Sequence, residues 1–299
     1  MEPSGVIILN KPAGMTSHDC VNKMRRLFDT KKVGHTGTLD PMATGVLPIL
    51  IGRAAKAADL LTAENKLYRA GLRLGLTTDT EDTTGNTLST SDSIPDEATV
   101  RSVCATFVGG IMQIPPMYSA LKVGGQKLVD LARRGVTIER EARPITINSI
   151  VVESTSDPTD YILTIDCSKG TYIRTLCANI GEKLGCGGCM SSLERLGIGN
   201  FKLADSVTIE YISEFAPEER QSLLRPVESL FYDLPELILP EFFERLSRNG
   251  CEVYLKKLGL GFPVGTRVRL CGSEGFYALG EVMEFENGPA VKAIKLFEL

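Results

Sequence analysis

The sequence predicts an α+β fold followed by a small β-barrel. Three observations favour it. The chain has 299 residues, of which 43% are hydrophobic and 23% charged, enough for one large and one small domain. Helical and strand patterns are interspersed as far as about residue 233. Beyond that point, short apolar runs alternate with Gly and Pro turns, which is typical of a small barrel. We therefore expect domains at residues 1–232 and 233–299.

The first part of the chain is expected to begin with a strand and a helix. The apolar run Val6 to Leu9 predicts the strand, and a turn over residues 11–17 leads into a helix that starts near Ser17 and ends near Asp29. The next predicted elements are a buried strand at residues 46–51, a short helix at 53–61 and an alternating strand at 66–74.

Further along, residues 77–93 are polar and rich in turn residues. The pattern then predicts helices at 96–108 and 126–134, an extended stretch at 111–123, and strands at 145–152 and 161–167. A helix beginning after residue 171 places five apolar side chains on one face, namely Ile173, Leu176, Cys177, Ile180 and Leu184. The expected barrel strands are residues 253–255, 267–270, 277–284 and 290–296.

Several function classes are disfavoured by composition. The longest uncharged apolar stretch, residues 42–51, contains Gly and Pro and is too short to span a bilayer. The apolar run at residues 5–9 is too short for a signal-peptide core, so we expect a cytoplasmic protein without a membrane partner. The 8 cysteines show no pairing pattern, and the single CxxC at 186–189 lacks a second ligand pair, so no metal site is predicted.

The net charge of -4 is unevenly distributed along the chain. Residues 203–252 carry 4 basic and 11 acidic residues, whereas residues 1–80 carry 11 basic and 7 acidic ones. An acidic total is therefore compatible with a basic face that binds nucleic acid. Solvated faces without any partner would give the same charges.

Residues 34–45 place three glycines, His35 and Pro41 around one carboxylate, Asp40. Glycines can adopt positive φ and proline restricts its own φ and the residue before it, so this loop is expected to hold Asp40 in one pose. An Asp-Pro turn that only connects two strands would look similar, and composition alone leaves both interpretations open.

Four segments, taken together, resemble one family. They are residues 5–17, 34–48, 113–123 and 167–176. In this order they resemble the bacterial tRNA pseudouridine-55 synthases, the TruB family, over nearly all of residues 5–202. The tail is similar to that family's PUA RNA-binding domain, with weaker motif support.

The resemblance implies a pseudouridine-synthase fold, with a mixed, largely antiparallel sheet flanked by helices and a PUA-like barrel. It implies isomerisation of uridine to pseudouridine at position 55 of the tRNA T loop, after the base is flipped out. No cofactor or metal is implied. The partner would be the T stem-loop of tRNA, bound by a cytoplasmic monomer with no obligate protein partner.

The same resemblance implies roles for individual residues. Asp40 takes the catalytic position, with Tyr68 and Arg174 as the other catalytic residues, and the implied substrate-binding residues are His35, Tyr172, Leu193 and Lys11. Arg174 would keep the Asp40 carboxylate ionised, and Tyr68 would stack on the uracil or accept its C5 proton. Whether Asp40 attacks the base or assists at C1′ stays open. The loop glycines are expected to leave room for the flipped nucleotide.

Two alternatives remain from other classes. One is an RNA-binding or tRNA-folding module that has lost its chemistry. The other is a nucleoside glycosyl hydrolase, which would require a second acidic residue that the Asp40 segment does not supply. Glu194 departs from the family pattern by placing a negative charge where an RNA contact is expected.

Overall fold

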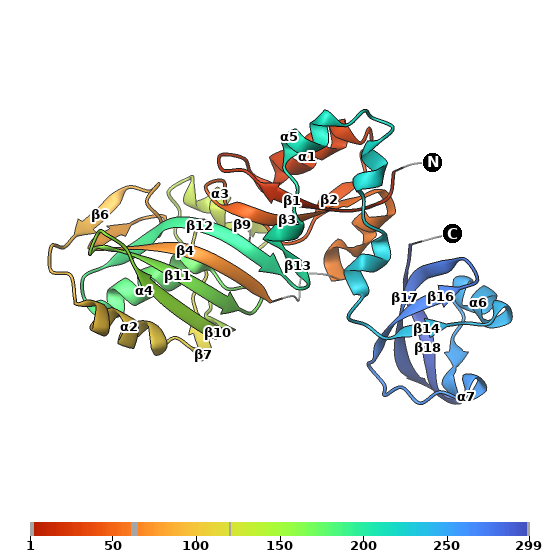
Figure 1. The fold of residues 1–299 in the computed structure, drawn as a ribbon. Helices are drawn as coiled ribbons and strands as arrows, with labels where there is room; N and C mark the ends of the chain where they lie inside the picture. The colour runs from red at the N-terminus through yellow and green to blue at the C-terminus, as the bar shows by residue number, and fades with distance from the viewer. Residues whose placement is uncertain (1–2, 61–64, 120, 298–299) are drawn as a thin grey trace.

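The computed structural model describes residues 3–60, 65–119 and 121–297, and it confirms the predicted α+β class (Figure 1). The main sheet is largely antiparallel, and β3 against β12 is the parallel pair along its path. Its strands, in spatial order, are β1 (Gly5–Lys11), β3 (Thr44–Ile51), β12 (Gly188–Ile198), β4 (Lys66–Leu74), β11 (Asp160–Cys167), β10 (Arg143–Ser154) and β7 (Gly109–Gln113). Two short strands pair with inner strands outside this order, β2 (Val33–His35) with β3 and β13 (Phe201–Lys202) with β12.

The longer helices before residue 233 pack beside this sheet. Helix α1 (Ser17–Leu27) begins as predicted, because Thr16 and Asp19 form a reciprocal capping box. Helix α4 (Ile173–Leu184) packs on β12 and β4, and α2 (Glu97–Ala105) packs on α4. The helix predicted at 53–61 is the 3₁₀ helix η1 (Gly52–Leu60), and its expected last residue lies outside the described chain. The remaining helical turns before residue 233 are η2 (Leu203–Asp205), α5 (Ile209–Glu214), η3 (Arg220–Leu223) and η4 (Val227–Phe231).

Strand β12 lies in the middle of the sheet, yet the sequence analysis did not predict it. Its pairing with β4 shifts register twice, between Met190 and Ser192 and again between Arg195 and Gly197. Each shift inserts an extra residue and so breaks the alternation of apolar and polar side chains that marks a strand. The strand is therefore recognisable only once its partners are in place.

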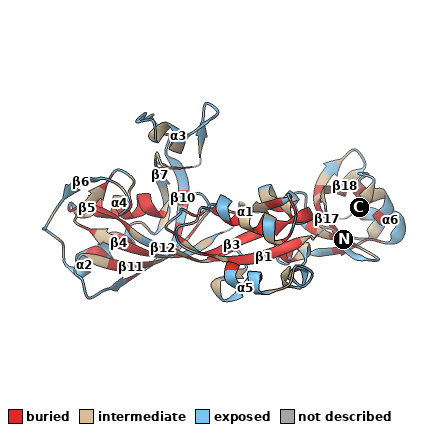
Figure 2. Ribbon diagram, turned by 90° about the horizontal axis from the view of Figure 1, so that it is seen from above, coloured by how far each residue is buried: buried red, intermediate tan, exposed pale blue. Residues whose placement is uncertain are grey.

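Two small hairpins project from the sheet. The polar segment at 77–93 contains β5 (Leu76–Thr78) and β6 (Thr87–Thr90). The second hairpin, β8 (Lys122–Val123) with β9 (Gln126–Lys127), leads into α3 (Leu128–Ala132), which is shorter than the helix predicted at 126–134. In Figure 2 the α3 region stands away from the sheet and is largely exposed.

The tail folds into a curled five-stranded sheet with its own apolar core, as expected for a PUA-like unit. Its spatial order is β14 (Glu236–Ile238), β16 (Arg267–Gly272), β17 (Gly275–Phe285), β18 (Gly288–Leu296) and β15 (Val253–Tyr254), with helices α6 (Glu241–Arg248) and α7 (Leu255–Leu258). Phe231 stacks with Phe276 and Phe297 in a cluster that joins this sheet to β1 and β3. Because that cluster bridges residue 233, the boundary there stays a prediction.

Among the residues that the structure describes, no helix is both long enough and apolar enough to cross a bilayer.

Helix α4 can approach β12 closely because Gly181 faces the turn before that strand. A Cβ at position 181 would lie 2.1 Å from the Gly188 nitrogen. Replacing a helical glycine by alanine ordinarily stabilises a helix by up to about 1 kcal/mol. We predict the opposite sign for Gly181→Ala, a loss of about 3 kcal/mol in unfolding free energy, because the helix must move off the sheet. Urea denaturation measures the unfolding free energy, and Asn179→Ala on the same helix is the control that should be tolerated. An increase in stability of Gly181→Ala would contradict the close approach.

Candidate active site

Asp40 lies in the loop between β2 and β3, and the start of α1 holds this loop on both sides of the carboxylate. The Ser17 hydroxyl accepts a hydrogen bond from the Leu39 N–H at 2.8 Å and donates to the Leu39 carbonyl at 3.1 Å. On the other side, the Gly14 N–H donates to the Pro41 carbonyl at 2.8 Å. The peptides on either side of Asp40 are therefore fixed, as expected for a loop that aims one side chain.

Lys11 holds the same loop from the end of β1. Its side chain is fully buried, and its ammonium donates to the carbonyls of Pro12 at 2.8 Å, Met15 at 2.6 Å and Pro41 at 3.3 Å. Burial lowers the pKa of Lys11, and the negative charge of Asp40 opposes that change. The sequence analysis placed Lys11 among the substrate-binding residues. In the structure its ammonium binds these three carbonyls and so links the turn before α1 to the Asp40 loop.

Arg174 reaches Asp40 from the first turn of α4. Its Nε lies 3.0 Å from Asp40 Oδ2 and its Nη2 lies 3.3 Å from Oδ1, so both carboxylate oxygens are engaged. The Arg174 side chain is only 6% exposed, whereas that of Asp40 is 35% exposed. This geometry leaves the Asp40 carboxylate accessible while Arg174 is fixed. A two-point pair of this kind orients the carboxylate as well as attracting it.

Arg174 is itself held by two segments far away in the sequence. Its Nη2 donates to the Tyr118 carbonyl at 2.7 Å and its Nη1 to the Thr80 carbonyl at 3.1 Å. Asp82 Oδ2 lies 3.8 Å from Nη1, and the other Asp82 oxygen accepts hydrogen bonds from Thr80 and Thr84. The sequence analysis missed Asp82. Its only signal was an acidic residue in a turn-rich segment.

The protonation state of Asp40 results from opposing effects. Burial raises its pKa, Arg174 opposes the rise, and the negative charge of Asp82 adds to it. The net direction is upward, so Arg174 offsets burial only in part. The carboxylate is thus a stronger base than an exposed aspartate and still faces a fixed cation.

Two tyrosines lie near this pair. Tyr68 is buried on β4, and Tyr172 immediately precedes α4. Burial raises the pKa of both phenols, and the charge of Asp40 contributes to each rise. The buried Gln113 side chain donates to the Tyr172 carbonyl at 3.0 Å and accepts from its N–H at 2.8 Å. Gln113 thereby fixes the backbone from which Arg174 extends.

Two glycines of the Asp40 loop allow Arg195 of β12 to approach closely, Gly45 next to its backbone and Gly37 next to its side chain. A Cβ on Gly45 would lie 2.3 Å from the Arg195 carbonyl oxygen, and one on Gly37 would lie 3.3 Å from Arg195 Nη1. Both glycines have positive φ, 101° and 72°. The expectation that they leave space for a flipped nucleotide is wrong for these two positions, because Arg195 occupies the space beside them.

The other predicted site residues are placed as follows. Leu193 is buried on β12, two residues before Arg195, so the two side chains share one face of the strand. His35 ends β2 and is half-buried, with its Nδ1 lacking a hydrogen-bond partner in the described chain. Burial lowers the pKa of His35, and Arg195 lowers it further, which favours the neutral imidazole.

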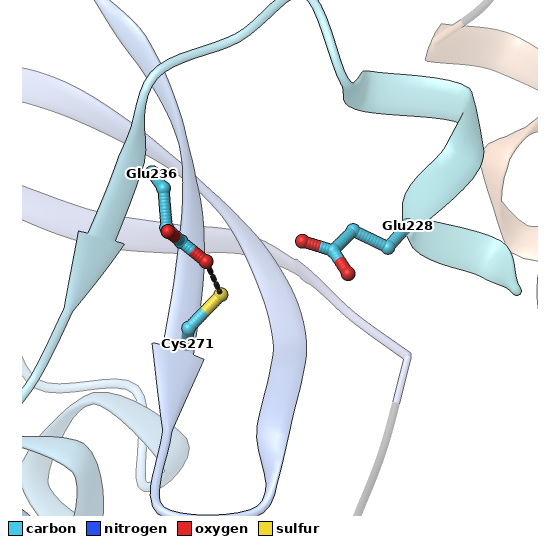
Figure 3. A group of neighbouring side chains, drawn as sticks. All are labelled: Glu228, Glu236 and Cys271. Carbon is cyan, nitrogen blue, oxygen red and sulfur yellow. Dashed lines mark hydrogen bonds between the residues drawn. The ribbon is translucent and has the colours of Figure 1, made fainter.

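One group of possible metal ligands occurs among the described residues, and it belongs to the junction with the C-terminal sheet. Figure 3 shows Glu228 from η4 reaching toward Glu236 on β14 and Cys271 on β16. Arg269 already pairs with Glu228, and the Cys271 thiol donates to Glu236 at 3.4 Å. Burial and Glu236 raise the pKa of Cys271 to about 12. A protonated thiol beside a paired carboxylate is a poor ligand set, so we assign no metal here.

The comparison with protein families finds two matches. Residues 25–173 match the N-terminal domain of the TruB family of pseudouridylate synthases, and residues 174–232 match the tRNA pseudouridylate synthase B C-terminal domain. Asp40 lies in the first of these matched ranges and Arg174 in the second.

Curated relatives and solved structures agree with the family matches. The chain is 45% identical over 250 residues to a tRNA pseudouridine synthase B of Clostridium kluyveri, covering 83% of this chain and 85% of the relative. It is 42% identical to that of Syntrophotalea carbinolica, covering 92% and 91%. Among solved structures, a chain of a Cbf5-Nop10-Gar1 complex is 27% identical with a TM-score of 0.75, covering 99% of this chain and 85% of that one.

The opposing effects on Asp40 lead to a titration experiment. Because Arg174 lowers the pKa of Asp40 against the effect of burial, Arg174→Met should raise that pKa further. Carboxyl ¹³C NMR of aspartate-labelled protein measures it, with Asp40→Asn identifying the signal. Arg73→Met, which removes the partner of Asp160, serves as control and should leave the Asp40 signal unchanged. A lower or equal Asp40 pKa in Arg174→Met would contradict the geometry.

Proposed function

The chain belongs to the TruB family of pseudouridylate synthases, and from this premise we propose that it isomerises uridine at position 55, in the T loop of tRNA, with Asp40 as its central catalytic group. The conversion of uridine to pseudouridine in tRNA is the activity of its relatives. The observation that carries the residue assignment is the two-point pair between the buried Arg174 and the accessible Asp40.

The reaction breaks the bond between N1 and C1′, turns the uracil, joins C5 to C1′ and releases the C5 proton. Asp40 supports this as a nucleophile or as a stabiliser of charge, and a carboxylate with a raised pKa suits either role. Arg174 orients Asp40, while Tyr172 adds an aromatic surface beside it. We assign Tyr68 to stacking on the uracil and to accepting the C5 proton.

The target base must leave the stacked T loop to reach Asp40, which costs a few kcal/mol. We propose that His35 takes part in extruding the nucleotide and that Leu193 forms an apolar wall of the pocket. Lys11 contributes indirectly, because its ammonium is occupied by the loop carbonyls. Its role is to keep Asp40 in place during base flipping.

The protein is proposed to act as a cytoplasmic monomer without an obligate protein partner. The curled sheet of residues 236–296 is proposed to bind RNA as a second contact. No cofactor enters the proposed reaction, because carboxylate, guanidinium and phenol supply the nucleophile, the countercharge and the base.

The test of catalysis uses a T stem-loop transcript with tritium at uridine C5. Asp40→Asn removes the charge with little change in size, so we expect it to abolish tritium release while RNA binding persists. Asp166→Asn is the matched control, since that carboxylate only accepts a hydrogen bond from Asn148 on the neighbouring strand. Full activity of Asp40→Asn would refute the assignment. If the wild-type protein bound the RNA without releasing tritium, the inactive RNA-binding module would be favoured.

Light scattering after size-exclusion chromatography tests the oligomeric state. We expect the mass of one 32.5 kDa chain alone, and of one chain per RNA when the stem-loop is added in equal amount. A dimer that persists on dilution would contradict the proposal of a monomer.

A further inference from the structure

Arg195 is a buried cation for which the proposed catalytic roles give no reason. It is the largest of the fully buried side chains, at 0% exposure. No carboxylate in the described chain lies within ion-pair distance of it. Burying a guanidinium without a countercharge is costly for stability, and an apolar side chain of similar volume would avoid that cost.

Two of its nitrogens bind the Asp40 loop. Nε donates to the Val46 carbonyl at 2.7 Å and Nη2 to the Gly37 carbonyl at 3.0 Å, so Arg195 connects the two arms of the loop. The third nitrogen, Nη1, is buried and has no acceptor among the residues that the structure describes. One strong donor therefore remains available inside the site.

The neighbour of Arg195 across the sheet is Tyr68. The two residues are direct partners in the antiparallel pairing of β12 with β4, and both side chains are buried. The ionisable groups that face the Tyr68 phenol are Arg195 from β12, Cys167 from β11 and Asp40 from the loop. Burial raises the pKa of Tyr68, and Cys167 and Asp40 add to the rise. Arg195, the only cation among these three groups, opposes it both by its charge and as a hydrogen-bond donor.

We propose that Arg195 is a positioning residue that acts through Tyr68: its free donor holds the Tyr68 oxygen toward the uracil and stabilises the phenolate form that accepts the C5 proton. This inference rests on the proposed isomerisation and on Tyr68 as the base. In the step, the C5–H bond breaks and its electron pair forms the C5–C6 double bond, while the electron pair of the C6–N1 double bond moves to N1, which takes a proton from solvent. The proton moves to the Tyr68 phenolate oxygen, and the phenol later returns it to solvent.

Arginine suits this position better than lysine. The planar guanidinium reaches two backbone carbonyls and still presents a further N–H in a fixed direction, whereas an ammonium offers one compact charge. The close approach of Gly37 and Gly45 to Arg195 shows how tightly the loop is built around it.

The experiment compares two stem-loop substrates. Uridine must lose a C5 proton after rearrangement, whereas 5-fluorouridine has no C5 proton to lose. In single-turnover assays at pH 7.5 we expect Arg195→Met to slow isomerisation of the uridine substrate by about 100-fold, within the range of general-base effects. Rearrangement of the 5-fluorouridine substrate should keep its wild-type rate. A C5 deuterium isotope effect should increase in the variant, and raising the pH toward 9.5 should recover part of the rate.

The controls separate this role from a purely structural one. Tyr68→Phe should show the same selective loss, and Arg73→Met, on β4 but paired with Asp160, should show none. Equal slowing of both substrates by Arg195→Met, or slowing of neither, would overturn the proposal. If Arg195→Met fails to fold by circular dichroism, Arg195→Lys is compared in the same two assays. A wild-type protein inactive on both substrates would instead refute the proposed function.

Discussion

The rest of the site depends on the pair formed by Asp40 and Arg174. A carboxylate that must meet a substrate has to stay accessible, and yet it needs a countercharge that does not move. The structure meets both needs by burying the cation almost completely and leaving the carboxylate partly exposed. Arg174 is held by the carbonyls of Thr80 and Tyr118, so three distant segments converge on one guanidinium. Asp82 adds negative charge to the same cluster, so Arg174 serves two carboxylates and leaves Asp40 a stronger base.

The Asp40 loop is built on backbone carbonyls bound to buried cations. Lys11 binds the Pro41 carbonyl of the loop and two carbonyls of the turn before α1, and Arg195 binds the carbonyls of Gly37 and Val46. Both side chains are fully buried. Carbonyl dipoles compensate a buried charge less completely than a carboxylate does, so this arrangement is costly for stability. Asp40 is the acidic side chain of this loop, and its charge opposes the effect of burial on the pKa of Lys11.

The C-terminal sheet is attached to the body of the protein through an apolar cluster. Phe231, Phe276 and Phe297 stack together, and Lys56 of η1 donates to the Leu296 carbonyl at 3.1 Å. The two chain ends also lie on this side of the molecule (Figure 1). The RNA-binding surface proposed for this sheet would keep a defined position relative to Asp40. This arrangement favours a substrate with a fixed shape, such as folded tRNA.

Local pattern in the sequence determined the elements with regular periodicity and the chemistry of the loop. The alternation at 66–74 predicted β4, and the apolar face after residue 171 predicted α4. The family resemblance pointed to Asp40, Tyr68 and Arg174 as candidate site residues. Only the tertiary structure decided what surrounds them. Strand β12 carries two register shifts that erase its pattern, so Arg195 could not be placed beside Tyr68. The burial of Lys11 and the contact of Asp82 with Arg174 likewise depend on segments far apart in the chain, because burial and charge pairing arise from packing.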